Sequence, residues 1–312
     1  MWSFFIRRLL QMIPTLLGVI LLVFFLFNWV GGDPAYILAG KLASAEDIAN
    51  IRHQLGIDQP WYWQLWIFIQ QIATGNFGDS WATHESVAHI FKTRLTPSLV
   101  LLIPMMIIET VTAVCLALLV AVFRRSMIDQ SLMVVSTIMM SISLLVYIIV
   151  GQYLFASLLG WFPVKGWSDS LWRDLTYYAP LPIFLGLLVS IAPSLRLYRT
   201  FILDEINQDY VRTARAKGLS ESRVLFKHVL KNAAIPILTN LLMGLPGLLT
   251  GAFLLERFFA IPGIGREIIL AVERSDFPII KAATVYVAIA TMLANLLADL
   301  LYRYLDPRVN LK

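Results

Sequence analysis

The sequence predicts an all-α integral membrane protein, because of its composition and the spacing of its apolar runs. The 312 residues are 58% hydrophobic and 14% charged, whereas a typical soluble domain carries about 25% charged residues. A helix that crosses a membrane needs about 20 consecutive, mostly apolar residues. We predict six such helices, which are, in chain order, Leu9–Val30, Ser98–Phe123, Ser131–Leu159, Tyr177–Leu195, Ala233–Leu255 and Ala282–Tyr302.

Two of these runs need separate justification. The first follows two arginines and so resembles a signal peptide, but its apolar part is too long and no small-residue cleavage site follows it. The fourth is short and carries three prolines, at positions 180, 182 and 193. We predict that both runs are membrane spans.

The lysines and arginines of the loops predict that both termini are cytoplasmic. With the N-terminus inside, 15 of the 25 Lys and Arg residues fall in the inner segments 1–8, 124–130, 196–232 and 303–312, although the outer segments are longer in total. The net charge of +5 is spread over these loops, so it indicates topology and does not indicate a nucleic-acid surface. The single cysteine, Cys115, excludes an internal disulfide and is expected to be a packing residue.

The inner segment after the fourth span is basic and favours helix. We expect one helix over 201–217, ended by Gly218 in the left-handed conformation that glycine favours, and a second helix capped by Ser220. Two interpretations stay open. The segment is either an amphipathic element lying on anionic lipid or a docking element for a cytoplasmic partner. Small residues line its turn, where a partner could pack closely: Ala214, Ala216, Gly218 and Ser220.

This segment also contains a family motif, formed by Tyr210–Gly218, Phe226–Ala233 and Pro236. It resembles the cytoplasmic EAA loop of ABC importer permeases. More narrowly, it resembles the first permease subunit of dipeptide, oligopeptide and nickel uptake systems, the dipeptide-permease-B-like group. Aligned on Gly218, the glutamate of the general motif falls at Arg212 and its first alanine at Thr213, a departure that the peptide subfamily commonly shares.

The resemblance covers nearly the whole chain. Further motifs match in the same order, at Leu55–Pro60, Gly75–Ser80, Gly160–Gly166, Phe258–Arg266, Arg274–Pro278 and Asp306–Arg308. One departure lies in the third span, where Ser141-Ile142-Ser143 lacks the proline of the family's Ser-x-Pro-x-Phe pattern. Because a proline would kink that helix, its absence is expected to reshape the wall of the pathway.

The resemblance implies the type I ABC importer transmembrane fold and a division of labour between subunits. The chain would be a permease subunit of the bacterial inner membrane and not an enzyme. Its implied partners are a second homologous permease, two cytoplasmic ABC ATPases that hold ATP and Mg²⁺, an extracytoplasmic substrate-binding protein and membrane lipid. The implied substrate is a di- or oligopeptide, with a nickel or other metal chelate as the alternative. The residues implied to couple to the ATPases are Arg212, Thr213, Ala214, Arg215, Gly218, Leu219, Ser220 and Arg223.

These features divide the chain into four parts. Residues 1–30 would form a cytoplasmic tail and the first span, 31–95 an extracytoplasmic segment, 96–304 the ABC transmembrane type-1 domain with the coupling loop at 201–235, and 305–312 a cytoplasmic tail. The second part contains an aromatic cluster. We expect the cluster to anchor at headgroup level or to help receive the binding protein: Trp61, Tyr62, Trp63, Trp66 and Phe68.

Polar or small residues within the apolar runs are the candidates for lining a pathway. They are Glu109, Ser141, Ser143, Asn240, Met243, Gly244 and Gly247. Glu109 lies near the middle of its span, where an ionised carboxylate costs about 2.5–3.5 kcal/mol on insertion scales. It is therefore expected to face the bundle interior, either hydrogen-bonded to a neighbouring helix or lining the pathway.

The sequence lacks the signatures of competing functions. The Gly40-Lys41 pair has Ala35 where the first glycine of a phosphate-binding loop should stand, so we predict no nucleotide site on this chain. No H-E-x-x-H signature occurs, and we predict no metal or catalytic residue. Residues 78–82 lack the strand–turn–helix setting of a hydrolase nucleophile elbow. An ion-coupled carrier usually needs several ionisable groups near the midplane, and only Glu109 lies deep in a predicted span.

Overall fold

The structure is a computed structural model that describes residues 2–30, 32–39, 43–124, 126–168 and 170–305. These residues form helices and one isolated β-bridge, between Asp79 and Ser86. The helices are α1 (Trp2–Phe25), α2 (Pro34–Ala39), α3 (Ala45–Gln54), α4 (Trp61–Thr74), α5 (Val87–Val122), α6 (Met127–Ser141), α7 (Leu144–Gly151), α8 (Leu171–Arg173), α9 (Pro180–Ile206), α10 (Asp209–Ala216), α11 (Glu221–Val224), α12 (Leu230–Thr250), α13 (Phe253–Phe259), α14 (Ile264–Glu273) and α15 (Phe277–Leu305). Short π-helical turns lie at Leu26–Val30, Gln152–Leu158, Asp174–Tyr178 and Leu225–Val229.

Within the described ranges, five helical stretches are long and apolar enough to cross a membrane, or six if one bent pair counts as a span. They are Ile6–Trp29, Val87–Val122, Pro180–Ile206, Glu221–Thr250 and Phe277–Leu301, with Met127–Ser141 and Leu144–Leu158 as the bent pair. The proline-rich fourth run is a helix because Pro180 stands in its first turn, where a backbone N–H has no intrahelical partner. The fourth and fifth spans both extend beyond their predicted ends into the inner segment 196–232.

The third predicted span is wrong as a single helix over Ser131–Leu159. It breaks after Ser141, and the two halves meet at 87°. Ile142 and Ser143 are extended, with ψ of 128° and 150°. The Ser141 hydroxyl donates to the Thr137 carbonyl, a bond that bends helices. The Tyr147 hydroxyl donates to the free Met139 carbonyl at the end of α6. The bend therefore forms without the proline whose absence we expected to reshape this region.

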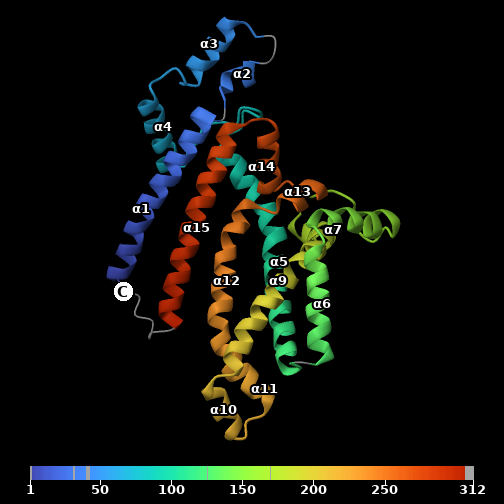
Figure 1. Ribbon diagram of the computed structural model, residues 1–312. Helices are drawn as coiled ribbons and strands as arrows, with labels where there is room; N and C mark the ends of the chain where they lie inside the picture. The colour runs from blue at the N-terminus through green and yellow to red at the C-terminus, as the bar shows by residue number, and fades with distance from the viewer. Residues whose placement is uncertain (1, 31, 40–42, 125, 169, 306–312) are drawn as a thin grey trace.

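The helices form an elongated bundle with distinct ends (Figure 1). Helix α5 packs along α9, α12 packs against α15, and α1 contacts α15 on the outside of the bundle. Helices α2 and α3 project from one end, and α10 and α11 lie at the opposite end. We refer to these as the α3 end and the α10 end.

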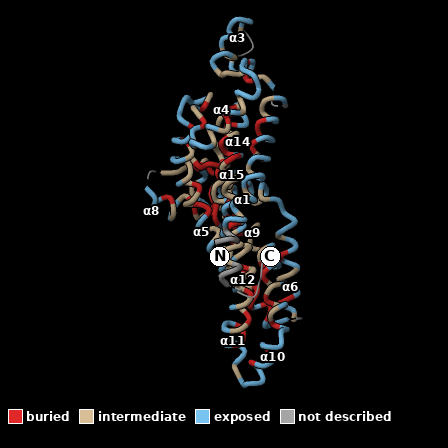
Figure 2. The backbone as a smooth tube through the Cα atoms, turned by 90° about the vertical axis from the view of Figure 1, so that its left-hand side faces the viewer, coloured by how far each residue is buried: buried red, intermediate tan, exposed pale blue. Residues whose placement is uncertain are grey.

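Buried residues lie along the axis of this bundle, as Figure 2 shows. They form three clusters: one joins α10–α12 to α5 and α9, one joins α1 and α4 to α15, and one joins α7 and α13 to α5 and α9. Large apolar side chains on α1, α6 and α7 are nevertheless exposed, among them Leu22, Ile138 and Ile149. Exposed apolar helix faces of this extent are typical of a chain that contacts lipid or other membrane subunits.

Candidate functional site

The basic segment folds as a short helical hairpin at the α10 end. The expected single helix over 201–217 is wrong, because α9 ends at Ile206 and α10 begins at Asp209. Between them, Gln208 is extended, and the Asn207 side chain donates to the Leu203 carbonyl, which satisfies one of the free acceptors at a helix end. The side chains of Asn207 and Gln208 thus favour a helix boundary that apolar periodicity does not reveal.

The turn of the hairpin has the expected conformation. Gly218 is left-handed with a φ of 77°, and Ser220 adopts the extended conformation of an N-cap, although its side chain makes no capping hydrogen bond. An ion pair closes the turn instead, since Arg215 donates through Nη2 and Nε to the Glu221 carboxylate at 2.6 and 3.1 Å. This hydrogen bond raises the pKa of Arg215 above its usual value.

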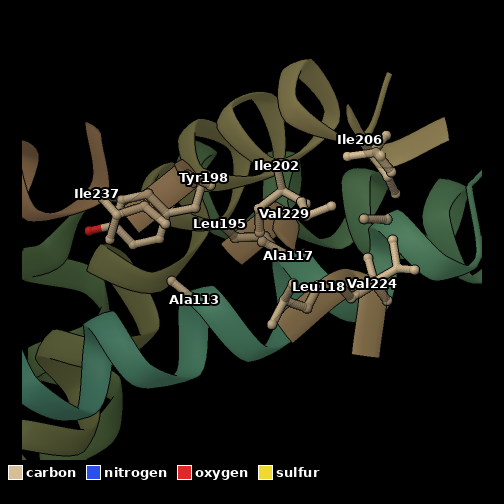
Figure 3. Packing of buried hydrophobic residues seen from close by; sticks show 14 of the residues in the cluster. Ala113, Ala117, Leu118, Leu195, Tyr198, Ile202, Ile206, Val224, Val229 and Ile237 are labelled. Atoms are coloured by element: carbon tan, nitrogen blue, oxygen red, sulfur yellow. The ribbon is translucent and has the colours of Figure 1, made fainter. Parts of the chain in front are cut away.

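One face of the hairpin is built into the bundle (Figure 3). Val211 and Val224 are fully buried in a cluster that includes Leu118 of α5 and Ile202 of α9. Complete burial of a valine side chain contributes about 1.5–3 kcal/mol. The hairpin is therefore packed as one body with α5 and α9, and a force on it would be transmitted to both helices.

The opposite face is exposed and basic. Six of the eight residues implied to couple to an ATPase are exposed: Arg212, Thr213, Arg215, Gly218, Ser220 and Arg223. Ala214 is instead buried in the cluster, and Leu219 is half-buried against it. Phe226, which belongs to the motif but which we did not select as a coupling residue, is 61% exposed next to these residues. The available signal was an aromatic residue within the basic motif, because aromatic residues are enriched at protein interfaces.

Two of the pathway candidates contact the same face of α9. The Ser194 hydroxyl donates to Glu109 Oε1 at 2.6 Å, and Asn240 Nδ2 donates to the Tyr198 hydroxyl at 3.3 Å. Ser194 and Tyr198 are four residues apart and so lie one turn apart on α9. Glu109 thus faces a neighbouring helix, which is the first of the two alternatives that we considered for it.

The other candidates are exposed on the isolated chain. Ser141 and Ser143 lie on either side of the α6–α7 break, whereas Met243, Gly244 and Gly247 lie on α12. The structure therefore places the seven candidates on three separate regions of the bundle and does not gather them into one closed site.

A buried ion pair joins α6 to α9 near the α10 end, and sequence reasoning missed it. Arg199 donates through Nε and Nη2 to both oxygens of Asp129, at 3.1 and 2.9 Å. The Asp129 side chain is only 7% exposed. In the sequence, Arg199 served only as one of the positive charges that predict membrane topology. Its pairing with Asp129 was not predicted, because the two residues are 70 positions apart.

A second buried carboxylate organises the α3 end. Glu256 is fully buried and accepts hydrogen bonds from the Ser98 hydroxyl and from the backbone N–H groups of Ala252 and Arg266. Burial raises the pKa of Glu256, and these hydrogen bonds lower it in part. A Cβ on Gly263 would lie 2.3 Å from this carboxylate, so the glycine is needed for the close approach.

A third contact joins two of the family motifs. Asp276, directly before α15, is buried and accepts hydrogen bonds from the Ser80 hydroxyl and the Trp81 and Ala82 N–H groups. The motifs at Gly75–Ser80 and Arg274–Pro278 are therefore two halves of one structural unit.

The aromatic cluster of α4 divides between two environments. Four of its members are at least half exposed: Trp61, Tyr62, Trp63 and Trp66. Phe68 is buried between α1 and α15. The exposed members remain available to lipid headgroups or a partner, whereas Phe68 fixes α4 to the bundle.

Comparison with known proteins decides the family. The family "binding-protein-dependent transport system inner membrane component" matches residues 113–311, and the corresponding N-terminal family matches residues 1–103. The chain belongs to this family of ABC importer permeases. It is similar to the proteins named glutathione transport system permease protein GsiC of Escherichia coli strain K12 and Shigella boydii serotype 4, with 36% identity, and of Salmonella choleraesuis, with 35%. Each alignment covers 312 residues, which is the whole of both chains.

Membership of the permease family confirms several predictions. The chain is a multi-pass inner membrane permease subunit of the peptide/oligopeptide group, with the type I ABC importer fold, and it is not an enzyme. Binding-protein-dependent permeases work with ATPase subunits and with a substrate-binding protein. The hairpin at the α10 end and the clustered loops at the α3 end are then the two surfaces available to soluble partners.

Proposed function

We propose that this chain forms one half of a translocation pathway for short peptides, the other half being a second homologous permease. The similarity to the GsiC permeases supports a peptide substrate, because glutathione, which their name mentions, is itself a short peptide. The exposed pathway candidates on α6 and α12 support a second permease, because polar and small residues on the surface of a membrane bundle favour contact with another helix.

We further propose that the hairpin α10–α11 is the contact for cytoplasmic ATPases, which hold the ATP and Mg²⁺. The observation that carries this proposal is the continuous packing of Val211 and Val224 with α5 and α9. When paired ATPases close on ATP, they would displace the hairpin, and the shared core would turn α5 and α9 as rigid bodies. We therefore expect the α10 end to face the cytoplasm, together with both termini.

Phe226 and Gly218 provide the test of ATPase coupling. Phe226→Ala removes an exposed aromatic side chain and should weaken ATPase binding while the permease stays folded, because such residues dominate many interfaces. Gly218→Arg should abolish both co-purification and uptake, since its Cβ position is open in the isolated chain but would meet a close-packed partner.

Gly218→Asn is the matched control, because asparagine tolerates the left-handed conformation and adds a shorter side chain. Retention of the ATPases and of transport by Gly218→Arg would instead favour a hairpin that only lies on lipid. The purified chain free of other subunits should not hydrolyse ATP, and hydrolysis in step with its amount would contradict the proposal.

Substrate class is tested in proteoliposomes that contain the complete transporter and its binding protein. We expect ATP-dependent uptake of radiolabelled di- or oligopeptides, unaffected by a proton ionophore. Uptake of ⁶³Ni as a chelate without peptide uptake would assign the metal-chelate alternative. Uptake that needs an ion gradient and no ATP would assign a secondary carrier.

A further inference from the structure

A cavity of about 650 Å³ lies at the α3 end, away from the pathway candidates and the hairpin. It lies between the end of α1, the outer segment containing α3 and α4, and the first turns of α15. Its wall combines aromatic and polar residues, and one lysine, Lys281, reaches it from α15. A volume of this size is in the range of ligand-binding cavities.

Lys281 has two aromatic rings close to its ammonium group. Its Nζ lies 5.6 Å from the ring centroid of Phe27 and 5.8 Å from that of Phe68, which stabilises a cation. Among the residues that the structure describes, no carboxylate lies within ion-pair distance of it. An ammonium in an apolar membrane setting is costly unless an anion approaches it.

The other ionisable groups of the cavity are already paired. Asp33 binds Arg52 through the guanidinium, and Asp58 binds His53 at 2.8 Å. Asn28 donates to Gln64 at 2.7 Å. Lys281 is thus the cation left to recognise an external ligand, and the ligand it favours is an anion.

The depth of Lys281 indicates where that anion comes from. It follows the first residue of α15, Phe277, by four positions, or about 6 Å along the helix. Three tryptophans line the same cavity, namely Trp29, Trp61 and Trp81, and tryptophan is enriched at the level of lipid headgroups. At the same end of the molecule, α1 exposes an apolar face formed by Leu21, Leu22 and Phe25, which Leu26 of the following π-helical turn continues. A lipid acyl chain could lie along this face.

We propose that this cavity binds one anionic phospholipid from the leaflet at the α3 end. The phosphate enters the cavity and pairs with Lys281, and the acyl chains lie on the exposed face of α1. The bound lipid would join α1 and α4 to α15. This inference needs only the membrane location of the chain and does not depend on the substrate proposed above.

The test measures lipid binding directly. The assembled transporter, purified in detergent and stripped of lipid, is titrated with phosphatidylglycerol and, separately, with phosphatidylcholine of the same acyl chains. Native mass spectrometry counts the bound lipid. We expect wild type and Lys281→Arg to bind phosphatidylglycerol preferentially, and Lys281→Met to bind it about tenfold more weakly, the effect of losing one charge-assisted contact. Lys165→Met, which removes an exposed lysine of another loop, should behave as wild type.

Each contrary result overturns the proposal. Equal affinity of wild type and Lys281→Met for phosphatidylglycerol would show that Lys281 does not recognise the lipid. Displacement of the lipid by millimolar inorganic phosphate would assign the cavity to a soluble anion. If Lys281→Met fails to assemble, the comparison of the two lipids on the wild-type transporter still tests the proposal. Equal binding of phosphatidylglycerol and phosphatidylcholine would exclude recognition of the negative charge.

Discussion

Ser98 and Glu256 are separated by 158 residues, and the Ser98 hydroxyl donates a 2.8 Å hydrogen bond to Glu256 Oε1. The same hydroxyl accepts a hydrogen bond from the Ile264 N–H at 2.8 Å. Ser98 therefore ties α5 to α13 and to the first residue of α14. This contact fixes the α3 end of the bundle around a carboxylate that does not reach solvent.

Glu256→Gln should destabilise the protein by about 1–3 kcal/mol, the effect of leaving buried polar groups unsatisfied. Oε1 accepts two hydrogen bonds and Oε2 accepts one from Arg266 N–H, so an amide must direct its NH₂ group at a donor. The measurement is the midpoint of thermal unfolding, followed by tryptophan fluorescence. Glu273→Gln, at an exposed ion pair, is the control. Equal midpoints for the two variants would contradict the structural role of Glu256.

The two arginine–carboxylate pairs near the α10 end should differ in strength. Arg199→Ala leaves the buried Asp129 carboxylate without its two-point partner and is expected to cost about 3–5 kcal/mol. Arg215→Ala breaks an exposed pair, with side chains 40% and 51% exposed, and should cost at most about 1 kcal/mol. Thermal unfolding of both variants checks this order, and a larger loss in Arg215→Ala would refute it.

Ser143→Pro should be tolerated, although the position lies within an apolar run that we predicted to be one helix. Ser143 has a φ of −70° and Ile142 is extended, which suits proline and the residue before it. We expect a change between no effect and a gain of about 0.4–1 kcal/mol. Ser136→Pro, within α6, is the matched control and should cost about 3 kcal/mol or more. A similar loss of folded protein in both variants would argue for a continuous helix.

Topology is tested by accessibility of single cysteines on a Cys115→Ala background. Ser220→Cys lies in the exposed hairpin and Thr83→Cys in an exposed loop of the α3 end. In intact cells stripped of their outer membrane, an impermeant maleimide should label Thr83→Cys and should spare Ser220→Cys until the inner membrane is opened. Ser80 is unsuitable, because it is buried against Asp276. The reverse pattern would place the hairpin outside.

Glu109→Gln should leave transport of peptides nearly unchanged. The Ser194 hydroxyl donates to Oε1, and a glutamine carbonyl accepts the same hydrogen bond. Uptake of free-amine and N-acetylated forms of one peptide should therefore fall by similar, small factors. Selective loss of the free-amine peptide would instead show that the carboxylate meets the substrate's positive charge in the pathway.

Local sequence was sufficient for features that depend on near neighbours or on composition. Apolar runs of about 20 residues predicted the spans, because a helix in lipid satisfies its own backbone hydrogen bonds. Gly218 predicted the turn of the hairpin, since few other residues adopt its left-handed conformation. The motifs around this turn are local sequence and indicate the permease family without the tertiary structure.

Tertiary structure alone decided the features whose partners are distant in the chain. At the α6–α7 bend, the Tyr147 hydroxyl donates to the free carbonyl of Met139, and the apolar run breaks there although it has no proline. Nothing in the sequence distinguishes Ala214 from the other small residues of the motif. Its packing against α5 and α9 is what shows that its side chain is buried. Likewise, Glu256 lies just outside the fifth predicted span, Ala233–Leu255, but Ser98 and the backbone around Gly263 enclose it. A charged residue can be buried when its hydrogen-bond partners converge on it in space, and local sequence does not show this convergence.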